Sequence, residues 1–223
     1  MKFFKSFLIL TALFFLKNDS TKAYYFQLSD LSTSIIFKYE CKSDTSKTEY
    51  WKLTSNTKKN TLITEAYSND LKKYEFFVEE FNSDGSKVLK FISYHWNKIG
   101  EIEVIKNNLK EVDVFKWKKD QTYCYSSEYI DGTYGKVSFS KCRTFLKEEV
   151  LTILGKDYPV LKFKGVYKTK IPGANYDNEY YQYSYYAQGL GLVKMEKNYP
   201  NGKTTVLELT EIISNDDWEK KLN

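Results

Sequence analysis

Residues 121–145 read QTYCYSSEYIDGTYGKVSFSKCRTF, and this stretch predicts the fold class of the chain. Two segments rich in aromatic residues, serine and valine, Gln121–Tyr129 and Lys136–Phe145, flank a turn-rich centre at residues 130–135. Such segments on either side of a glycine-containing turn are typical of a β-hairpin. We therefore expect a hairpin centred near Thr133.

The same hairpin gives the cysteines a structural interpretation. Cys124 and Cys142 lie at almost equal distances from Thr133, so the hairpin would place them opposite each other as a candidate disulfide. Cys41 would then stay unpaired or pair between chains. The alternative is that all three cysteines are small buried apolar residues.

Outward from the hairpin, segments rich in Tyr, Phe, Val, Ile and Thr alternate with turn residues along most of the chain. The expected strands are residues 34–41, 49–54, 62–67, 74–81, 88–96, 101–106, 111–117, 121–129, 136–145, 149–153, 158–167, 190–197 and 204–213. This spacing predicts a mainly β fold, a long antiparallel meander that curls into a half-open or incomplete barrel.

Helix is expected to be scarce, with one or two short helices in total. The candidates are Leu28–Ser32, Lys147–Leu151 and Asn215–Leu222. Residues 169–179 contain Pro172 and Gly173 and are expected to form the longest irregular connection. The predicted division is a signal peptide at 1–23, a single β domain at 24–214 and a polar C-terminal tail at 215–223.

A curled sheet has a concave face, and the apolar residues on that face are candidates for contact with a ligand. The candidate ligand-facing residues are Phe37, Trp51, Phe76 and Leu192. The same face could instead hold a helix or a core made by the side chains of the protein itself.

The first 23 residues have the three parts of a secretory signal peptide. Lys2 and Lys5 give a charged start, an apolar run extends over residues 7–16, and a small residue, Ala23, precedes the expected cleavage site. The apolar run is about ten residues long, whereas a helix needs about 20 to span a bilayer. We therefore expect cleavage, no stable membrane span afterwards, and a periplasmic or secreted location. The alternatives are a retained anchor or a buried apolar segment.

Charge argues against nucleic acid as a partner. Removal of residues 1–23 would take away four lysines and one aspartate, so the net charge would fall from +5 to +2. Arg143 is the only arginine in the sequence, and the lysines are scattered among carboxylates. The chain therefore has neither a basic stripe nor a set of arginines for bidentate contacts with phosphate.

The motifs of common enzymes and metal sites are absent from the sequence. His95 is the only histidine, and its place between Tyr94 and Trp96 on an expected strand favours packing in a sheet over catalysis. No H-E-x-x-H, Cys/His cluster or G-x-S-x-G elbow occurs. We expect no enzymatic activity, no catalytic residues, no cofactor and no metal site.

Six tyrosines occur between Tyr176 and Tyr186. They could form an aromatic platform for sugar rings or for a peptide. Tyrosine also suits a half-exposed β-sheet, with its ring toward the protein and its hydroxyl in water, and this interpretation is favoured.

Residues 185–194, YYAQGLGLVK, carry a resemblance to the TapB-like family of exported β proteins from Gram-negative bacteria. Gly202 and the segment VLEL at 206–209 are also similar, as is LGKDYPVLKF at 154–163, with a looser likeness at FKYE (37–40) and YW (50–51). The resemblance covers most of the chain after residue 23. It implies a distant similarity to the curved, incomplete barrels of the lipoprotein carriers LolA and LolB, and no catalytic residues.

The sequence therefore favours an exported, non-enzymatic envelope protein with a concave sheet face. That face would bind an apolar or lipid-like ligand, or a segment of an envelope protein. The alternatives are a structural or interaction protein with a self-filled core, a glycan-binding module that uses the tyrosines between Tyr176 and Tyr186, and an outer-membrane barrel. The oligomeric state is not predicted.

Overall fold

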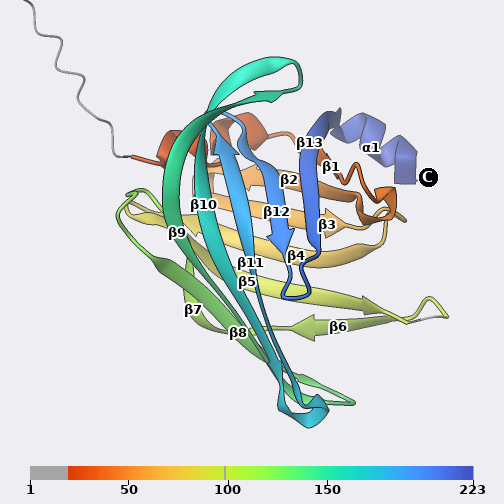
Figure 1. Ribbon diagram of the computed structural model, residues 1–223. Helices are drawn as coiled ribbons and strands as arrows, with labels where there is room; N and C mark the ends of the chain where they lie inside the picture. Colours follow the sequence, from red (N-terminus) through yellow and green to blue (C-terminus); the bar gives the residue numbers. More distant parts are fainter. Residues whose placement is uncertain (1–19, 98, 223) are drawn as a thin grey trace, which may run out of the picture.

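Thirteen β-strands form one antiparallel sheet in the computed structural model, which describes residues 20–97 and 99–222 (Figure 1). The strands are β1 (Ile35–Glu40), β2 (Glu49–Asn56), β3 (Thr61–Tyr67), β4 (Lys73–Phe81), β5 (Gly85–Trp96), β6 (Ile102–Lys106), β7 (Asn108–Lys116), β8 (Tyr123–Asp131), β9 (Gly135–Ile153), β10 (Lys156–Ile171), β11 (Tyr176–Ala187), β12 (Gly191–Asn198) and β13 (Thr204–Ser214). Helix α1 spans Asn215–Leu222. Short 3₁₀ helices lie at Lys22–Tyr24, Leu28–Leu31, Thr45–Lys47, Thr57–Lys59 and Pro172–Ala174.

The sheet closes into a barrel. Strand β1 pairs with β13, which joins the first strand to the last, while β5 pairs with both β4 and β7. Twelve strands therefore form the wall, and β6 pairs with β5 beside this closed circuit. The predicted mainly β meander is confirmed, whereas the predicted half-open or incomplete barrel is wrong. Closure pairs the backbone groups that the two edges of an open sheet would leave unpaired.

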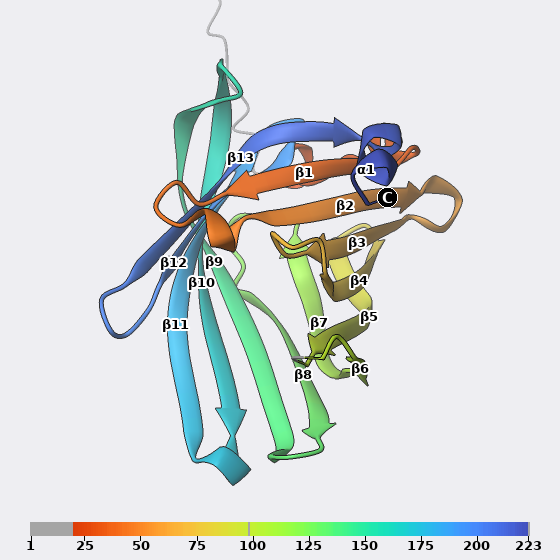
Figure 2. The same ribbon diagram turned by 90° about the vertical axis from the view of Figure 1, so that its right-hand side faces the viewer.

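The two longest strands are β9 and β10, and they run with β11 down one side of the molecule in Figure 2. Strand β9 joins two expected strands and includes the expected helix at Lys147–Leu151, because Lys147, Glu149 and Leu151 pair with β10. The expected irregular connection at 169–179 is also mostly strand, interrupted by the turn at Pro172–Ala174. Cross-strand pairing has overridden the local preference in both places.

Cys124 and Cys142 form a disulfide between β8 and β9. The two residues are direct partners in the hairpin, whose innermost pair is Asp131 and Gly135. Cys41 is a free, buried cysteine. The disulfide therefore braces one wall of the barrel.

One end of the barrel is packed with apolar side chains, and we call it the packed end. Its centre is Phe115, which is fully buried and whose ring contacts those of Tyr25, Phe163 and Tyr186 at centroid distances of 4.4, 5.2 and 4.9 Å. Tyr25 comes from the segment that precedes β1, which lies at the top of the barrel in Figure 1. This segment therefore supplies part of the core.

Residues 20–23 contact the barrel as well. The Thr21 side chain is buried, its backbone N–H donates to the Trp117 carbonyl at 2.9 Å, and its hydroxyl donates to the Lys116 carbonyl at 2.6 Å. Cleavage after Ala23 would remove these contacts. The rest of the predicted signal peptide, residues 1–19, lies outside the described residues, so its processing stays a prediction.

The C-terminal residues pack on the outer face of the barrel. Helix α1 buries Trp218 completely, against Ile36, Tyr50 and Tyr67. Within residues 20–97 and 99–222, no helix has the length and apolar character that a membrane crossing requires.

Candidate functional site

A cavity of about 240 Å³ lies inside the barrel, next to the packed end. Its walls come from strands on both sides of the barrel and from the segment before β1. The lining residues include the six charged residues Glu49, Glu75, Glu79, Lys141, Arg143 and Lys197. The aromatic lining residues are Tyr25, Phe26, Trp51, Tyr74, Phe77, Tyr125, Phe139, Tyr167, Tyr180 and Tyr186. The barrel interior at this level is thus charged as well as aromatic.

Strand alternation brings these charges inward. Successive side chains of a strand point to opposite faces, so every second residue of β4 and of β9 faces the interior. On β4 these are Glu75, Phe77 and Glu79, and on β9 they are Phe139, Lys141 and Arg143. Each strand therefore carries two charges in the phase that the core would normally fill with apolar residues.

Glu79 is buried but has hydrogen-bond partners. Its Oε2 accepts from the Tyr25 and Ser86 hydroxyls, each at 2.7 Å. Burial raises the pKa of Glu79, and the two hydrogen bonds oppose the rise. The bond from Tyr25 also links this carboxylate to the segment that closes the top of the barrel. Glu79 thus has a structural role.

Glu75 differs from Glu79 in that no hydrogen bond or ion pair to its carboxyl group is found among the described residues. Burial raises the pKa of Glu75 from 4.5 to about 7, and the nearby charge of Glu49 contributes to the rise. Near pH 7 this side chain is therefore divided between its neutral and its charged form. A group in this state responds strongly to any charge placed beside it.

Lys141 is the basic counterpart of Glu75. Its ammonium lies 4.6 Å from the ring centre of Tyr167 and 5.7 Å from that of Tyr125, with no ion-pair partner within the described part of the chain. Burial lowers its pKa well below the usual value, and the neighbouring charge of Arg143 lowers it further. Contacts with aromatic faces stabilise an ammonium less than a carboxylate does.

Arg143 keeps its positive charge at all ordinary pH values. Its Nη1 donates to the Val114 carbonyl at 3.2 Å, and its guanidinium lies over the rings of Phe115, Tyr123 and Tyr186 at 5.3–5.9 Å. Its Nε is buried without a hydrogen-bond partner. Arg143 therefore separates the packed end from the cavity and still has an unused donor.

Glu49 and Lys197 form the ion pair of the cavity, at 3.0 Å. Trp51 Nε1 and the Tyr74 hydroxyl also donate to Glu49, at 3.1 and 2.9 Å. Burial alone would lower the pKa of Lys197, but the charge and hydrogen bond of Glu49 raise it. This corner of the cavity is satisfied internally, which leaves Glu75 and Lys141 as the groups available to a ligand.

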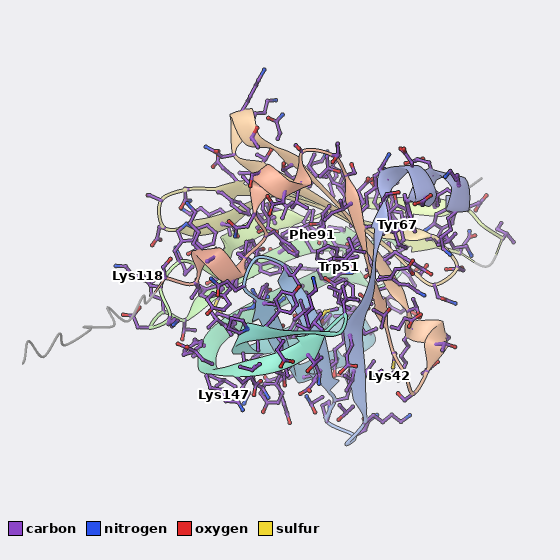
Figure 3. The ribbon with its side chains drawn as sticks, turned by 90° about the horizontal axis from the view of Figure 1, so that it is seen from above. Lys42, Trp51, Tyr67, Phe91, Lys118 and Lys147 are labelled. Atoms are coloured by element: carbon purple, nitrogen blue, oxygen red, sulfur yellow. A yellow bond between two sulfur atoms is a disulfide. The ribbon has the colours of Figure 1, made fainter. Side chains whose placement is uncertain are left out.

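Two of the four residues predicted to face a ligand line the cavity, namely Trp51 and Leu192. Figure 3 places Trp51 toward the middle of the molecule and Lys42, Lys118 and Lys147 around its outside. Phe37 is buried in the core. Phe76 lies between the inward-facing Glu75 and Phe77, so its side chain is on the outer face, with the Lys90 ammonium 5.2 Å from its ring centre.

The tyrosines between Tyr176 and Tyr186 divide between the two faces of β11. Tyr180 and Tyr186 line the cavity. Tyr181 and Tyr183 are on the opposite face, where their rings are in edge contact at 5.3 Å. The expected aromatic platform is therefore split by the wall of the barrel.

None of the six charged lining residues was predicted from the sequence: Glu49, Glu75, Glu79, Lys141, Arg143 and Lys197. The alternation of side chains along each strand could have revealed them, because each charged residue stands at an inward-facing position that is normally apolar. The only arginine of the chain, within an otherwise β-type segment, was the clearest indication.

One glycine is needed to seat the segment before β1. Gly191 has a φ of +88°, and a Cβ there would lie 2.4 Å from the Phe26 ring. Phe26 is 6% exposed and lines the upper end of the cavity. Gly191 thus has a packing role.

The comparisons with known proteins reveal a shared fold. No family model matches the sequence. No curated protein matches it either. A candidate lipoprotein from Parabacteroides distasonis has a similar structure, with a TM-score of 0.55 and 11% identity over 85% of this chain and 97% of that one. A candidate exported protein with a YmcC-like fold from Bacteroides fragilis gives a TM-score of 0.50 and 10% identity over 81% of this chain and 94% of that one. The likeness to TapB-like proteins, LolA and LolB stays a prediction, and the chain shares its barrel with structures described as lipoprotein and exported proteins.

Proposed function

We propose that this protein is a non-enzymatic binding protein of the cell envelope whose barrel holds a small zwitterionic molecule. The observation that carries the proposal is that Glu75 and Lys141 both face the cavity and that neither has an ion-pair partner among the described residues. Glu75 and Lys141 attract each other without forming an ion pair. Buried charges without a direct partner are costly, so such groups in a cavity indicate a ligand that pairs with them.

The chemistry of the cavity defines the class of ligand. A carboxylate of the ligand would pair with Lys141, close to the positive charge of Arg143, while an ammonium of the ligand would face Glu75. The cavity of about 240 Å³ has the volume of about eight water molecules in the liquid. Its aromatic walls suit an apolar or aromatic body. An amino acid or a compound of similar size meets all three requirements.

The lipid-like ligand expected from the sequence fits the cavity less well. An acyl chain would cover Glu75, Lys141 and Arg143 without pairing with any of them, and buried unpaired charges destabilise a complex by several kcal/mol. A self-filled core is the second candidate, because the packed end shows that part of the barrel interior is already filled by side chains.

The envelope location has separate support. The N-terminal residues have the composition of a signal peptide. The structures that share the fold are described as lipoprotein and exported proteins. The disulfide between Cys124 and Cys142 is also typical of proteins outside the cytoplasm.

The test is a binding screen with the twenty standard amino acids as probes, by thermal shift and isothermal titration calorimetry on the purified exported protein. Oleate and a neutral sugar serve as controls. We expect at least one zwitterion to bind with 1:1 stoichiometry, and Lys141→Met and Glu75→Gln each to weaken it at least about tenfold. Lys162→Met, which removes a lysine from the outer face, should leave binding unchanged. Binding of oleate to wild type and Lys141→Met alike, or the absence of any zwitterion effect, would overturn the proposal.

Proton release gives a second readout. At pH 7 Glu75 is about half protonated, since its pKa is about 7. An ammonium placed beside it lowers this pKa, so binding should release up to about half a proton. Calorimetry in two buffers of different ionisation enthalpy measures that number. The contribution of Glu75 is the difference in protons released between wild type and Glu75→Gln, because a ligand carboxylate beside Lys141 would raise the lowered pKa of that lysine and so bind protons in both proteins.

A further inference from the structure

We infer that the lower rim of the barrel carries a site for a divalent transition-metal ion, formed by His95, Glu103 and Asp131. One ligand atom of each residue lies within 4.8 Å of the other two. Their types, one imidazole and two carboxylates, are those that Zn²⁺ and similar ions bind. This site is separate from the cavity lining and from the proposed ligand.

Three strands bring the residues together from distant parts of the chain. His95 is near the end of β5, Glu103 is its direct partner on β6, and Asp131 ends β8. In Figure 2, β6 lies next to the lower end of β8. Each residue comes from a different strand, which explains why sequence spacing did not reveal the site.

All three side chains lie on the inner side of their strands. His95 shares a face of β5 with Phe91 and Ser93, and Asp131 shares a face of β8 with Tyr125, which lines the cavity. His95 and Glu103 are exposed, and Asp131 is partly buried. The cluster therefore lies at the rim, where a hydrated ion can enter.

Hydrogen bonds hold the strands in this arrangement. Just above the cluster, Asn107 Nδ2 donates to Ser93 Oγ at 3.1 Å, and Ser127 Oγ donates to Asn107 Oδ1 at 3.2 Å. These bonds tie β5 to β8 through the residue that precedes β7. The ligands on both strands are thus positioned by their neighbours before any metal arrives.

Asp131 is itself oriented by the β8–β9 turn. Its Oδ1 accepts from the backbone N–H groups of Thr133 and Tyr134, each at 2.8 Å. These bonds hold the carboxylate and lower its pKa, as does the nearby His95. The His95 ring is in edge contact with Tyr129 at 6.2 Å. Asp131 therefore has supporting hydrogen bonds of the kind that orient metal ligands, and the His95 ring packs against Tyr129.

The charge of the cluster favours a divalent cation. Glu103 and Asp131 bring two negative charges together, and a bound Zn²⁺ would neutralise them while the imidazole supplies a nitrogen ligand. Water would complete the coordination, because three protein ligands leave at least one position open. Mg²⁺ and Ca²⁺ prefer all-oxygen sites and are expected to bind much more weakly.

The unique histidine makes the test specific. The chain contains a single histidine, so a tag-free sample has one set of imidazole resonances, all from His95. We expect titration with Zn²⁺ to shift or broaden these resonances up to one equivalent, and equal concentrations of Mg²⁺ to leave them unchanged. Unchanged His95 resonances at excess Zn²⁺ would overturn the inference.

Variants localise the effect. We expect His95→Gln, Glu103→Gln and Asp131→Asn each to weaken Zn²⁺ binding in calorimetry at least about tenfold. Asparagine at 131 keeps the oxygen that accepts from the turn, so the hairpin should stay folded. Glu80→Gln changes an exposed glutamate of β4 and serves as the control. Zn²⁺ binding that is equal in wild type and His95→Gln would contradict the site, whereas Lys141→Met, the cavity variant, should bind Zn²⁺ normally.

Discussion

The packed end and the cavity share the same strands but differ in what faces inward. At the packed end Phe115, Phe163 and Tyr186 fill the interior with aromatic rings. In the cavity, Glu75 and Lys141 occupy equivalent inward positions on β4 and β9. Apolar burial stabilises a fold, whereas buried charge without a partner opposes it. The packed end therefore supplies stability, and the charges of Glu75 and Lys141 oppose it.

The largest expected effect comes from the packed end. Phe115→Ala removes a fully buried ring and should lower the free energy of unfolding by about 4 kcal/mol. The matched variant is Phe139→Ala, whose ring is half-buried and borders the cavity. It should cost about 1–2 kcal/mol, because one side of this ring has no packed neighbour to lose. Chemical denaturation measures both, and equal losses would remove the distinction between the two regions.

Removal of the disulfide should have the next largest effect on stability. Cys124→Ser with Cys142→Ser opens a loop of sequence separation 18 and should lower stability by about 3 kcal/mol. The bridge braces β8 and β9, the strands that carry Tyr125 and Lys141 into the cavity. Wild type under reducing conditions should match the variant. An unchanged denaturation midpoint in both samples would show that the cavity wall does not depend on this bridge.

Glu75→Gln should stabilise the protein, and only at higher pH. The pKa of Glu75 is about 7 in the folded protein against 4.5 without the barrel, so the folded state binds more protons between these values. The contribution of Glu75 to the free energy of unfolding is fully present below about pH 4.5 and is lost as the pH rises through 7. The free energy of unfolding of the variant should therefore exceed that of wild type by about 3 kcal/mol at pH 8 and match it at pH 4.5. A constant difference across this range would mean that Glu75 is not desolvated.

The outer face should show the smallest effect. Tyr181→Ala removes a ring that is 37% exposed and should change stability by about 0.5 kcal/mol or less. The same variant tests the glycan-binding alternative on a glycan array. Binding to an array that Tyr181→Ala abolishes would favour the outer tyrosines over the cavity as the functional surface.

Local features of the fold were predictable, and long-range ones were not. The hairpin centred on Thr133 follows from its turn residues, and the structure has it there. Closure depends on the pairing of β1 with β13, strands that are distant in sequence and carry no local signal of their partnership.

The candidate site was predictable only in part. The alternation of apolar residues placed Trp51 and Leu192 on the inner face, where they line the cavity. It also placed Phe76 there, whereas Phe76 lies on the outer face of β4. Glu75 and Lys141 were not predicted to face the cavity, because charged residues on a strand are ordinarily assigned to the solvated face. The His95 cluster required the pairing of β5 with β6 and the position of β8, neither of which the sequence reveals.

A crystal structure of the protein grown with the amino acid that gives the largest thermal shift tests the central claim most directly. We predict one molecule in the cavity, with its carboxylate within hydrogen-bond distance of Lys141 Nζ and its ammonium facing Glu75. A cavity that contains only water, or an acyl chain that lies along the aromatic wall, would contradict the account.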